Sequence, residues 1–231
     1  MTPIDTTPPA SRVLVVLPNN LGDVIMATPV LEGLGASLPR TRVHFVVEEG
    51  FEAGLENNPF CDRLIRLPRK TIRNALRSAR PNIGLALLRQ FVAEFGAQPY
   101  DTLINLSQHP YLSYLLSLLP AGGRCGRHYL REGNHAVDDP WSRYLYCIPY
   151  ARAYNRLHAV DVYRRIAGVS THRGGYTICL DREEVDAAAR RLRENGIDPD
   201  LDRIIVFQPG AAYPAKRWPA DNYVELGRRL G

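Results

Sequence analysis

The stretch VLVVLPNNLGDVIMATP, residues 13–29, predicts how this chain begins to fold. Its first five residues are all apolar, as in a central parallel strand that is buried on both faces. A polar turn of one proline and two asparagines follows, and then apolar residues return at helical spacing. A strand, a short turn and a helix in this order form the first unit of an α/β fold.

The same alternation of strand and helix continues over the next hundred residues. We expect Pro29 to kink the first helix or to shorten its first turn. The pattern predicts strands at 42–47, 61–67 and 101–106, and helices at 71–79, 83–95 and 111–119. This order predicts a doubly wound parallel sheet. Residues 122–154 are less regular, and we expect loops with one or two helices there.

Composition divides the chain into three parts. Residues 1–11 are polar and rich in proline, which predicts a loose tail. Residues 12–169 hold the α/β pattern and predict an N-terminal Rossmann-like domain. Residues 170–231 open on the linker-like STHRGG and continue with a helix, an apolar stretch at 203–208 and another helix. We expect this part to be the beginning of a second α/β domain, because its one predicted strand has no neighbour to pair with.

The net charge, the cysteines and the apolar stretches of the sequence favour a cytoplasmic protein that binds a small anionic molecule or surface. The 231 residues carry 29 Lys and Arg against 24 Asp and Glu, a net charge of +5. This excess is too small to indicate nucleic-acid binding. The four cysteines lack the spacing of a zinc site or a disulfide framework. No stretch is long and apolar enough to predict a transmembrane helix.

Asp23 allows two interpretations. A short carboxylate at a helix start can be the N-cap, which accepts hydrogen bonds from the first free amides of the helix. Because ligands bind beyond the carboxyl ends of parallel strands, Asp23 can instead be a general base that takes the proton of an attacking sugar hydroxyl. Gly22 beside it would let the backbone approach a ligand closely. The turn lacks G-x-G-x-x-G and G-x-x-x-x-G-K-[ST], which disfavours a dehydrogenase or a P-loop enzyme.

Two motifs together carry a resemblance to a known family. NNLGDVIMATPVLEGL resembles the N-terminal signature of glycosyltransferase family 9, the lipopolysaccharide heptosyltransferases, and FQPGAAYPAKRWPADNYVELGRRL resembles its second signature. YDTLINLSQ is a weaker match. The resemblance implies a GT-B architecture, in which two Rossmann-like domains face a cleft that closes during the reaction.

The resemblance also implies an activity: inverting, metal-independent transfer of heptose from ADP-heptose to the inner core of lipopolysaccharide. Asp23 matches the family's catalytic base, and Lys216 matches the lysine that meets the donor phosphates. No cofactor beyond the donor substrate is implied. The acceptor would lie against the first domain, near Asn19, Asn20 and Gly22, and the nucleotide mainly against the second.

The loop at residues 209–219 is the expected donor site. Its glycine and small residues, Gly210, Ala211 and Ala212, precede a predicted helix whose N-terminus can seat a phosphate. Lys216 and Arg217 add positive charge that would stabilise the departing diphosphate. Some family members carry hydroxyl side chains at the two alanines, so phosphate contacts there would come from backbone amides. The alternative is a surface loop whose cations are only solvated.

A basic segment between residues 63 and 80 is the expected acceptor site. It contains seven cations and no acid. If residues 70–80 are helical, Arg69, Arg73, Arg77 and Arg80 share one face, where an anionic ligand would relieve their repulsion. We expect Arg66, Arg69, Arg73 and Arg77 to bind the acceptor. A solvated face, or contact with an anionic membrane, is the alternative.

Two further functions remain open from the sequence. One is a GT-B glycosyltransferase that uses another nucleotide sugar, and the other is a non-catalytic module that binds anionic glycolipid. The 231-residue piece alone is expected to be inactive, because its second domain would be incomplete.

Overall fold

A computed structural model describes residues 11–95, 98–130, 132–211 and 213–230, so the predicted tail at 1–11 lies almost wholly outside the described residues. The chain divides into two compact units, and the boundary in the sequence lies between Cys179 and Leu180.

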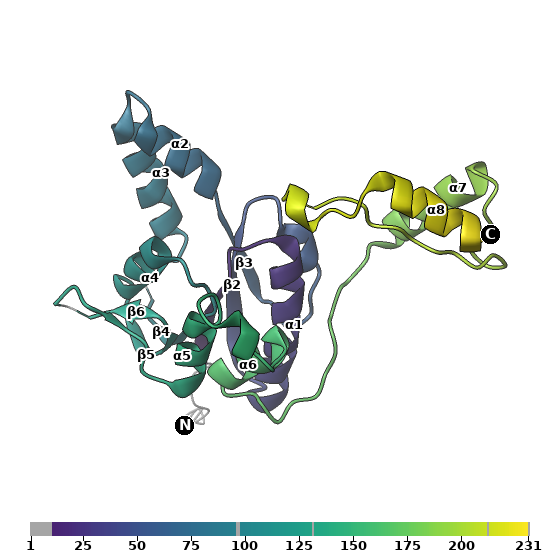
Figure 1. The fold of residues 1–231 in the computed structure, drawn as a ribbon. Coiled ribbons are helices and arrows are strands. Elements are labelled where there is room, and N and C mark those ends of the chain that lie inside the picture. Colours follow the sequence, from purple (N-terminus) through teal and green to yellow (C-terminus); the bar gives the residue numbers. More distant parts are fainter. Residues whose placement is uncertain (1–10, 96–97, 131, 212, 231) are drawn as a thin grey trace, which may run out of the picture. The chain divides into compact units, whose positions relative to one another are not determined.

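The first unit is built on a five-stranded parallel sheet (Figure 1). Its strand order is β3-β2-β1-β4-β5, so the strand predicted first lies at the centre. The strands are β1 (Arg12–Val16), β2 (Arg42–Glu48), β3 (Arg63–Leu67), β4 (Tyr100–Asn105) and β5 (Ala121–Gly126). The prediction of a doubly wound α/β fold is confirmed.

The fifth strand corrects the sequence prediction of loops after residue 122. Its sequence, AGGRCG, holds three glycines and no β-branched residue, so nothing in it favours a strand. Pairing with β4 determines its conformation: Ile104 lies beside Cys125, and Asn105 beside Gly126. Beyond it, β6 (His128–Tyr129) and β7 (His135–Ala136) form a small antiparallel pair.

Helices cover both faces of the sheet because successive side chains of each strand point to opposite faces. Val13 and Val15 of β1 pack with α1 (Leu21–Ser37), α5 (Pro140–Cys147) and α6 (Ala159–Ile166). Leu14 and Val16 pack on the other side with α2 (Arg69–Arg77), α3 (Pro81–Ala93) and α4 (Pro110–Ser117). Two short 3₁₀ helices, η1 (Glu52–Gly54) and η2 (Arg152–Tyr154), lie in the connections.

The helix α1 continues through Pro29, so its first turn is not shortened. Proline has no N–H to donate to the carbonyl of Ile25. The Thr28 hydroxyl donates to that carbonyl at 2.8 Å, and the same hydroxyl oxygen accepts the N–H of Thr177 at 3.0 Å. The Thr177 carbonyl accepts from Asn58 at 3.3 Å. The segment at 170–179, which has the composition of a linker, is thus attached to the first unit.

The second unit contains two helices, α7 (Arg182–Glu194) and α8 (Ala220–Leu230), and a 3₁₀ turn, η3 (Pro214–Lys216). Asp181 caps α7 by accepting the N–H of Glu183 at 2.9 Å. The predicted strand at 203–208 is wrong, since these residues are extended without strand pairing. A strand needs hydrogen-bonded neighbours, and among the described residues none lies beside it. Its apolar side chains stay exposed, and Val206 is 83% accessible.

Candidate functional site

The turn after β1 places Asp23 at the carboxyl edge of the sheet. The N-cap of α1 is Asn20, whose carbonyl accepts the N–H groups of Asp23 at 3.0 Å and Val24 at 3.1 Å. Asp23 is therefore the third helical residue, and the interpretation of Asp23 as the N-cap is wrong. Its carboxylate lies 3.5 Å from the Asn20 side-chain amide and is half-exposed. It remains accessible for other contacts.

The surroundings of Asp23 combine a buried aromatic residue with open space. Tyr163 of α6 packs into the core beside α1, and its pKa is raised by burial and then by the negative charge of Asp23. The side-chain oxygen of Asn19 is buried and has no hydrogen-bond partner among the described residues. A Cβ added to Gly22 would meet no atom within 4 Å. The structure thus brings Asn19, Asn20 and Gly22 to one turn with Asp23.

A second polar cluster lies at the ends of β2, β3 and β4. Arg69 begins α2, directly after β3, and a guanidinium nitrogen lies 2.6 Å from a carboxylate oxygen of Glu48, the last residue of β2. Glu48 is only 1% exposed. Burial alone would lower the pKa of Arg69, but contacts with Tyr111 and Glu48 outweigh burial and raise it. Burial and the Arg69 charge lower the pKa of His109.

Glu48, His109 and Tyr111 were not predicted from the sequence as site residues. A signal for Glu48 existed, because it is the acid that ends the buried run RVHFVVE, just as Asp23 follows the run of β1. Ligands bind beyond the carboxyl ends of parallel strands, and this rule, which indicated Asp23, indicates Glu48 as well. Nothing in the sequence indicated that Arg69 would reach back to it.

The basic segment is less uniform than its sequence suggests. Arg63 pairs with Glu94 at 2.9 Å, and Arg66 pairs with Glu52 at 3.1 Å, so acids from other elements meet these cations. Arg80 does not share a face with the α2 arginines, because α2 ends at Arg77 and Arg80 is the N-cap of α3. The helix itself carries a row of three arginines: Arg69, Arg73 and Arg77.

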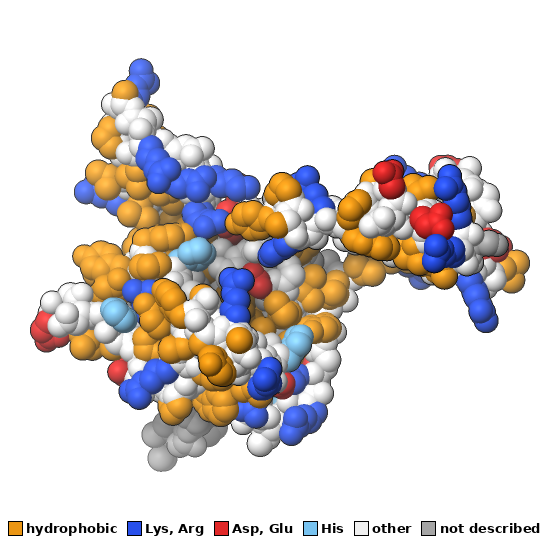
Figure 2. Space-filling model, viewed as in Figure 1, with side chains coloured by type: hydrophobic (Ala, Val, Ile, Leu, Met, Phe, Trp, Pro, Cys, Tyr) orange, Lys and Arg blue, Asp and Glu red, His pale blue; other side chains and the backbone are white. Residues whose placement is uncertain are grey.

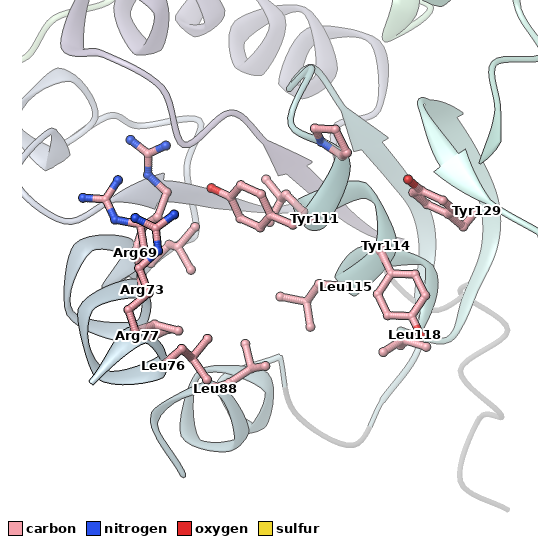
Figure 3. Close-up of a pocket in the computed structure, with 14 residues that line it drawn as sticks. Arg69, Arg73, Leu76, Arg77, Leu88, Tyr111, Tyr114, Leu115, Leu118 and Tyr129 are labelled. Atoms are coloured by element: carbon pink, nitrogen blue, oxygen red, sulfur yellow. The ribbon is translucent and has the colours of Figure 1, made fainter. Parts of the chain in front are cut away.

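This row forms one wall of a pocket of about 740 Å³ (Figure 3). The pocket lies between α2, α3 and α4, on the sheet face opposite α1. Hydrophobic side chains fill most of its other walls, and Figure 2 shows positive and hydrophobic side chains side by side over α2 and α3. The pocket therefore offers positive charge at one side and apolar surface elsewhere.

The second unit presents the other predicted residues. Lys216 is exposed in η3, with its ammonium 5.5 Å from the ring centre of Tyr213. The Arg217 guanidinium donates to the carbonyl of Ala211 at 2.8 Å, which ties the loop across six residues. Gly210 lies in the same loop, whereas Ala212 lies outside the described residues. The helix α8 follows the loop, as expected for a phosphate seat.

Neither unit, as far as it is described, contains three His, Cys, Asp or Glu side chains placed to hold a metal ion. No described helix is long and apolar enough to cross a membrane.

An open parallel sheet with helices on both faces, and polar side chains at its carboxyl edge, defines an α/β protein of the class in which ligands bind at that edge. The family model of glycosyltransferase family 9 (heptosyltransferase) matches residues 88–231, well over half of the chain. The chain belongs to glycosyltransferase family 9, as its motifs predicted.

Individual relatives agree with this assignment. Lipopolysaccharide heptosyltransferase 1 of Pseudomonas aeruginosa is 28% identical over 232 residues, which cover 95% of this chain and 58% of that protein. A family 9 crystal structure from Veillonella parvula is 26% identical, with a TM-score of 0.74 over 97% of this chain and 61% of the other. An E. coli heptosyltransferase, WaaC with ADP, shares the fold at 23% identity and a TM-score of 0.62, over 95% of this chain and 64% of the other. The chain thus spans about three fifths of these proteins.

Proposed function

We propose that the protein transfers heptose from ADP-heptose to the inner core of lipopolysaccharide. Membership of the heptosyltransferase family supports this proposal. The observation that carries it is the half-exposed Asp23, which stands at the carboxyl edge of the sheet and is not used as the helix cap. The reaction would take place on the cytoplasmic face of the inner membrane.

The proposed reaction is a single inverting displacement. An acceptor hydroxyl oxygen forms a bond to the anomeric carbon while the bond from that carbon to the diphosphate breaks. Asp23 takes the hydroxyl proton, and ADP leaves with the bonding electrons. Lys216, helped by Arg217 and the backbone from Gly210 to Ala212, stabilises the negative charge on ADP. These fixed cations can take the role that a divalent metal has in other transferases, so we propose that no metal is needed.

The acceptor side of the proposal rests on the first unit. Asn19, Asn20 and Gly22 would orient the sugar beside Asp23, and the arginines of α2, with Arg66, would hold anionic groups of the acceptor. Arg66 is already paired with Glu52, so we expect its contribution to be smaller than that of Arg73 or Arg77.

ADP release by the full-length protein tests the donor and the reaction together. We expect release only when ADP-heptose and a heptose-deficient lipopolysaccharide core are both present, and we expect it to persist in EDTA. Release with another nucleotide sugar but not with ADP-heptose would show that the protein uses a different donor. We expect the 231-residue piece alone to release none, because its second unit lacks a sheet among the described residues.

Asp161 provides a matched control for the catalytic base. It is the third residue of α6, as Asp23 is of α1, and it is also half-buried. Replacing either by Asn removes a carboxylate from the first turn of a helix, at a similar cost to the helix of about 0.3–1 kcal/mol. Only Asp23→Asn should lower kcat by about 10²–10⁴-fold while acceptor binding persists. Equal transfer by the two variants would show that Asp23 is not the base. Acceptor binding without transfer by any form of the protein would favour a binding module over an enzyme.

A further inference from the structure

The pocket between α2, α3 and α4 has a chemistry that the sugar-transfer reaction does not explain. Figure 3 shows Arg69, Arg73 and Arg77 together on one wall, Leu76 and Leu88 below them, and Leu115, Tyr114 and Leu118 on the other side. A volume of about 740 Å³ lies within the range of roughly 300–1,000 Å³ that small-molecule sites occupy. The cavity is large enough for a ligand of more than one group.

The apolar walls are exposed to an unusual degree for side chains that line one cavity. Leu118 is 66% accessible and Tyr114 is 54% accessible. Single exposed apolar side chains are common, but a contiguous group around a hollow marks a binding surface. The walls therefore indicate an apolar ligand.

The arginine wall adds a requirement for negative charge. Arg69 is paired with Glu48. Within the described residues, no carboxylate oxygen lies within 4.0 Å of the guanidinium of Arg73 or Arg77. Like charges four residues apart destabilise a helix by a few tenths of a kcal/mol, about 0.2–0.5. An anion at the wall would remove that penalty and form charge-assisted hydrogen bonds.

The shortage of polar groups in the apolar walls narrows the choice of ligand. A peptide in the pocket would bury amide groups, and each buried amide needs a hydrogen-bond partner. Leu76, Leu88, Leu115 and Leu118 offer none. A hydrocarbon chain has no such requirement, so the walls suit an acyl chain attached to an anionic head group.

We propose that this pocket binds an acyl chain of the glycolipid acceptor, with an anionic group of the acceptor at Arg73 and Arg77. The chemical class of the ligand, an anionic amphiphile, follows from the pocket alone. Its identity as the acceptor rests on the proposed function. The pocket would make the enzyme recognise the lipid part of its substrate as well as the sugar.

Direct binding tests the class of ligand with defined probes. The full-length protein is titrated with dodecyl phosphate below its micelle concentration, with inorganic phosphate and with the uncharged dodecyl maltoside. We expect dodecyl phosphate to bind at least about tenfold more tightly than either of the others, because it uses both the chain and the charge. Equal affinity for dodecyl phosphate and inorganic phosphate would overturn the proposal.

Two pocket variants and one control make the titration specific. Leu115→Trp fills the cavity, and we expect it to reduce dodecyl phosphate binding to nearly that of inorganic phosphate. Leu118→Gln changes an exposed side chain that the fold does not need, and it should weaken the chain-dependent part of binding if Leu115→Trp fails to fold. Leu38→Gln is the matched control, since Leu38 is 46% exposed at the end of α1 and lies outside the pocket. Unchanged binding in both pocket variants would overturn the proposal.

Vesicles distinguish a pocket from a membrane-docking surface. Phosphatidylglycerol vesicles are sedimented with the wild-type protein and with Leu115→Trp, in the presence and absence of dodecyl phosphate. If the surface only rests on the membrane, both proteins sediment equally and dodecyl phosphate does not compete. That result would overturn the proposal. Loss of sedimentation in Leu115→Trp, or competition by dodecyl phosphate, would support a pocket that takes individual chains.

Transfer to acylated and deacylated acceptors tests the identity of the ligand. We expect the wild-type protein to have a lower KM for the acylated than for the deacylated acceptor, and we expect Leu115→Trp to lose this preference. Equal KM values for both acceptors in the wild-type protein would overturn the acyl-chain proposal and leave the proposed function intact. No transfer to either acceptor, with dodecyl phosphate still bound in the pocket, would overturn the proposed function and the acceptor as occupant.

Discussion

The secondary structure around Asp23 differs strongly from that around Lys216. The strand before Asp23 pairs on both sides with β2 and β4, and the helix after it is packed against the sheet and α6. The extended residues before Lys216 have no paired strand among those described, and the lysine is exposed in a 3₁₀ turn. The comparison teaches that the position of a reactive side chain is set by the elements under it. Packing fixes the backbone at Asp23, whereas at Lys216 the described contacts hold only the loop itself.

The largest expected effect is at the fixed side of this comparison. Asp23→Asn in the full-length protein should lower kcat by about 10²–10⁴-fold, the contribution of a well-placed general base. The acceptor KM should change little, because the amide keeps the size of the carboxylate. The measurement is ADP release at saturating donor. A loss below tenfold would show that Asp23 only completes the first turn of α1.

Lys216→Ala tests the less supported side. We expect a loss of about 10²–10³-fold in kcat, the size seen when one group that stabilises developing charge is removed. Arg217→Lys is the comparison variant, because it keeps the positive charge but loses the guanidinium bond to Ala211 that shapes the loop. If Arg217→Lys costs more than Lys216→Ala, the shape of the loop matters more than the lysine charge.

The buried pair at the carboxyl edge predicts an asymmetry in stability. Arg69→Met leaves the buried Glu48 carboxylate without its partner, and we expect the free energy of unfolding to fall by about 3–5 kcal/mol. Glu48→Gln should cost less, about 1–3 kcal/mol, because Arg69 is partly exposed and can turn to water. The double variant should recover part of the loss. Urea denaturation measures all three, and equal single losses would contradict this account.

Two glycines of α1 separate the packed part of that helix from its open end. A Cβ at Gly35 would lie 2.8 Å from the Phe60 ring, so Gly35→Ala should lower the free energy of unfolding by about 1 kcal/mol. Gly22→Ala meets no atom and should leave stability unchanged or raise it by up to about 1 kcal/mol. Gly22→Ala should still raise the acceptor KM if the ligand approaches this backbone. Thermal unfolding and transfer assays distinguish the two effects.

The smallest expected effect is a pH dependence inside the first unit. Burial, followed by the charge of Arg12, lowers the pKa of His44 from its ordinary 6.5. The unfolded chain therefore takes up the proton first, so the stability from neutral His44 is complete above pH 6.5 and is lost as pH falls through the folded pKa. His44→Gln should reduce the loss of unfolding free energy between pH 7 and pH 5, by at most about 1.4 kcal/mol per pH unit. If the change of unfolding free energy with pH is the same in His44→Gln, His44 is not the cause of the pH dependence, and other groups such as His109 must be.

The first unit could be predicted because its signals are local and agree with one another. The apolar run of β1 and the polar turn after it indicated the central strand and the place of Asp23. β5 could not be predicted, because pairing with β4 alone makes its glycines a strand. The prediction of a strand at 203–208 was wrong because local preference was not enough. The residues there favour a strand, but no described neighbour pairs with them.

The candidate site was predictable only in part. Asp23 and Lys216 came from motifs, and the row of arginines came from their four-residue spacing. The acidic partners of the arginines could not be predicted from the sequence. Glu48, Glu52 and Glu94 lie on other elements and reach the arginines only in the folded unit. Tertiary contacts thus determine which arginines remain available to a ligand. Of the three arginines of α2, Arg73 and Arg77 are the two that have no described acidic partner.

The Thr28 hydroxyl, which bonds both Ile25 and Thr177, fixes where the chain leaves the first unit. Composition places that exit after residue 169, but the bond to Thr177 moves it eight residues on, by subtraction of 169 from 177. Thr28, which holds this exit, lies five residues from Asp23 on α1, an axial rise of about 7.5 Å. The connection to the second unit is therefore anchored on the helix that carries the proposed base. Pro29 leaves the Ile25 carbonyl free for the Thr28 hydroxyl, and that hydroxyl also holds the segment that leads to the second unit.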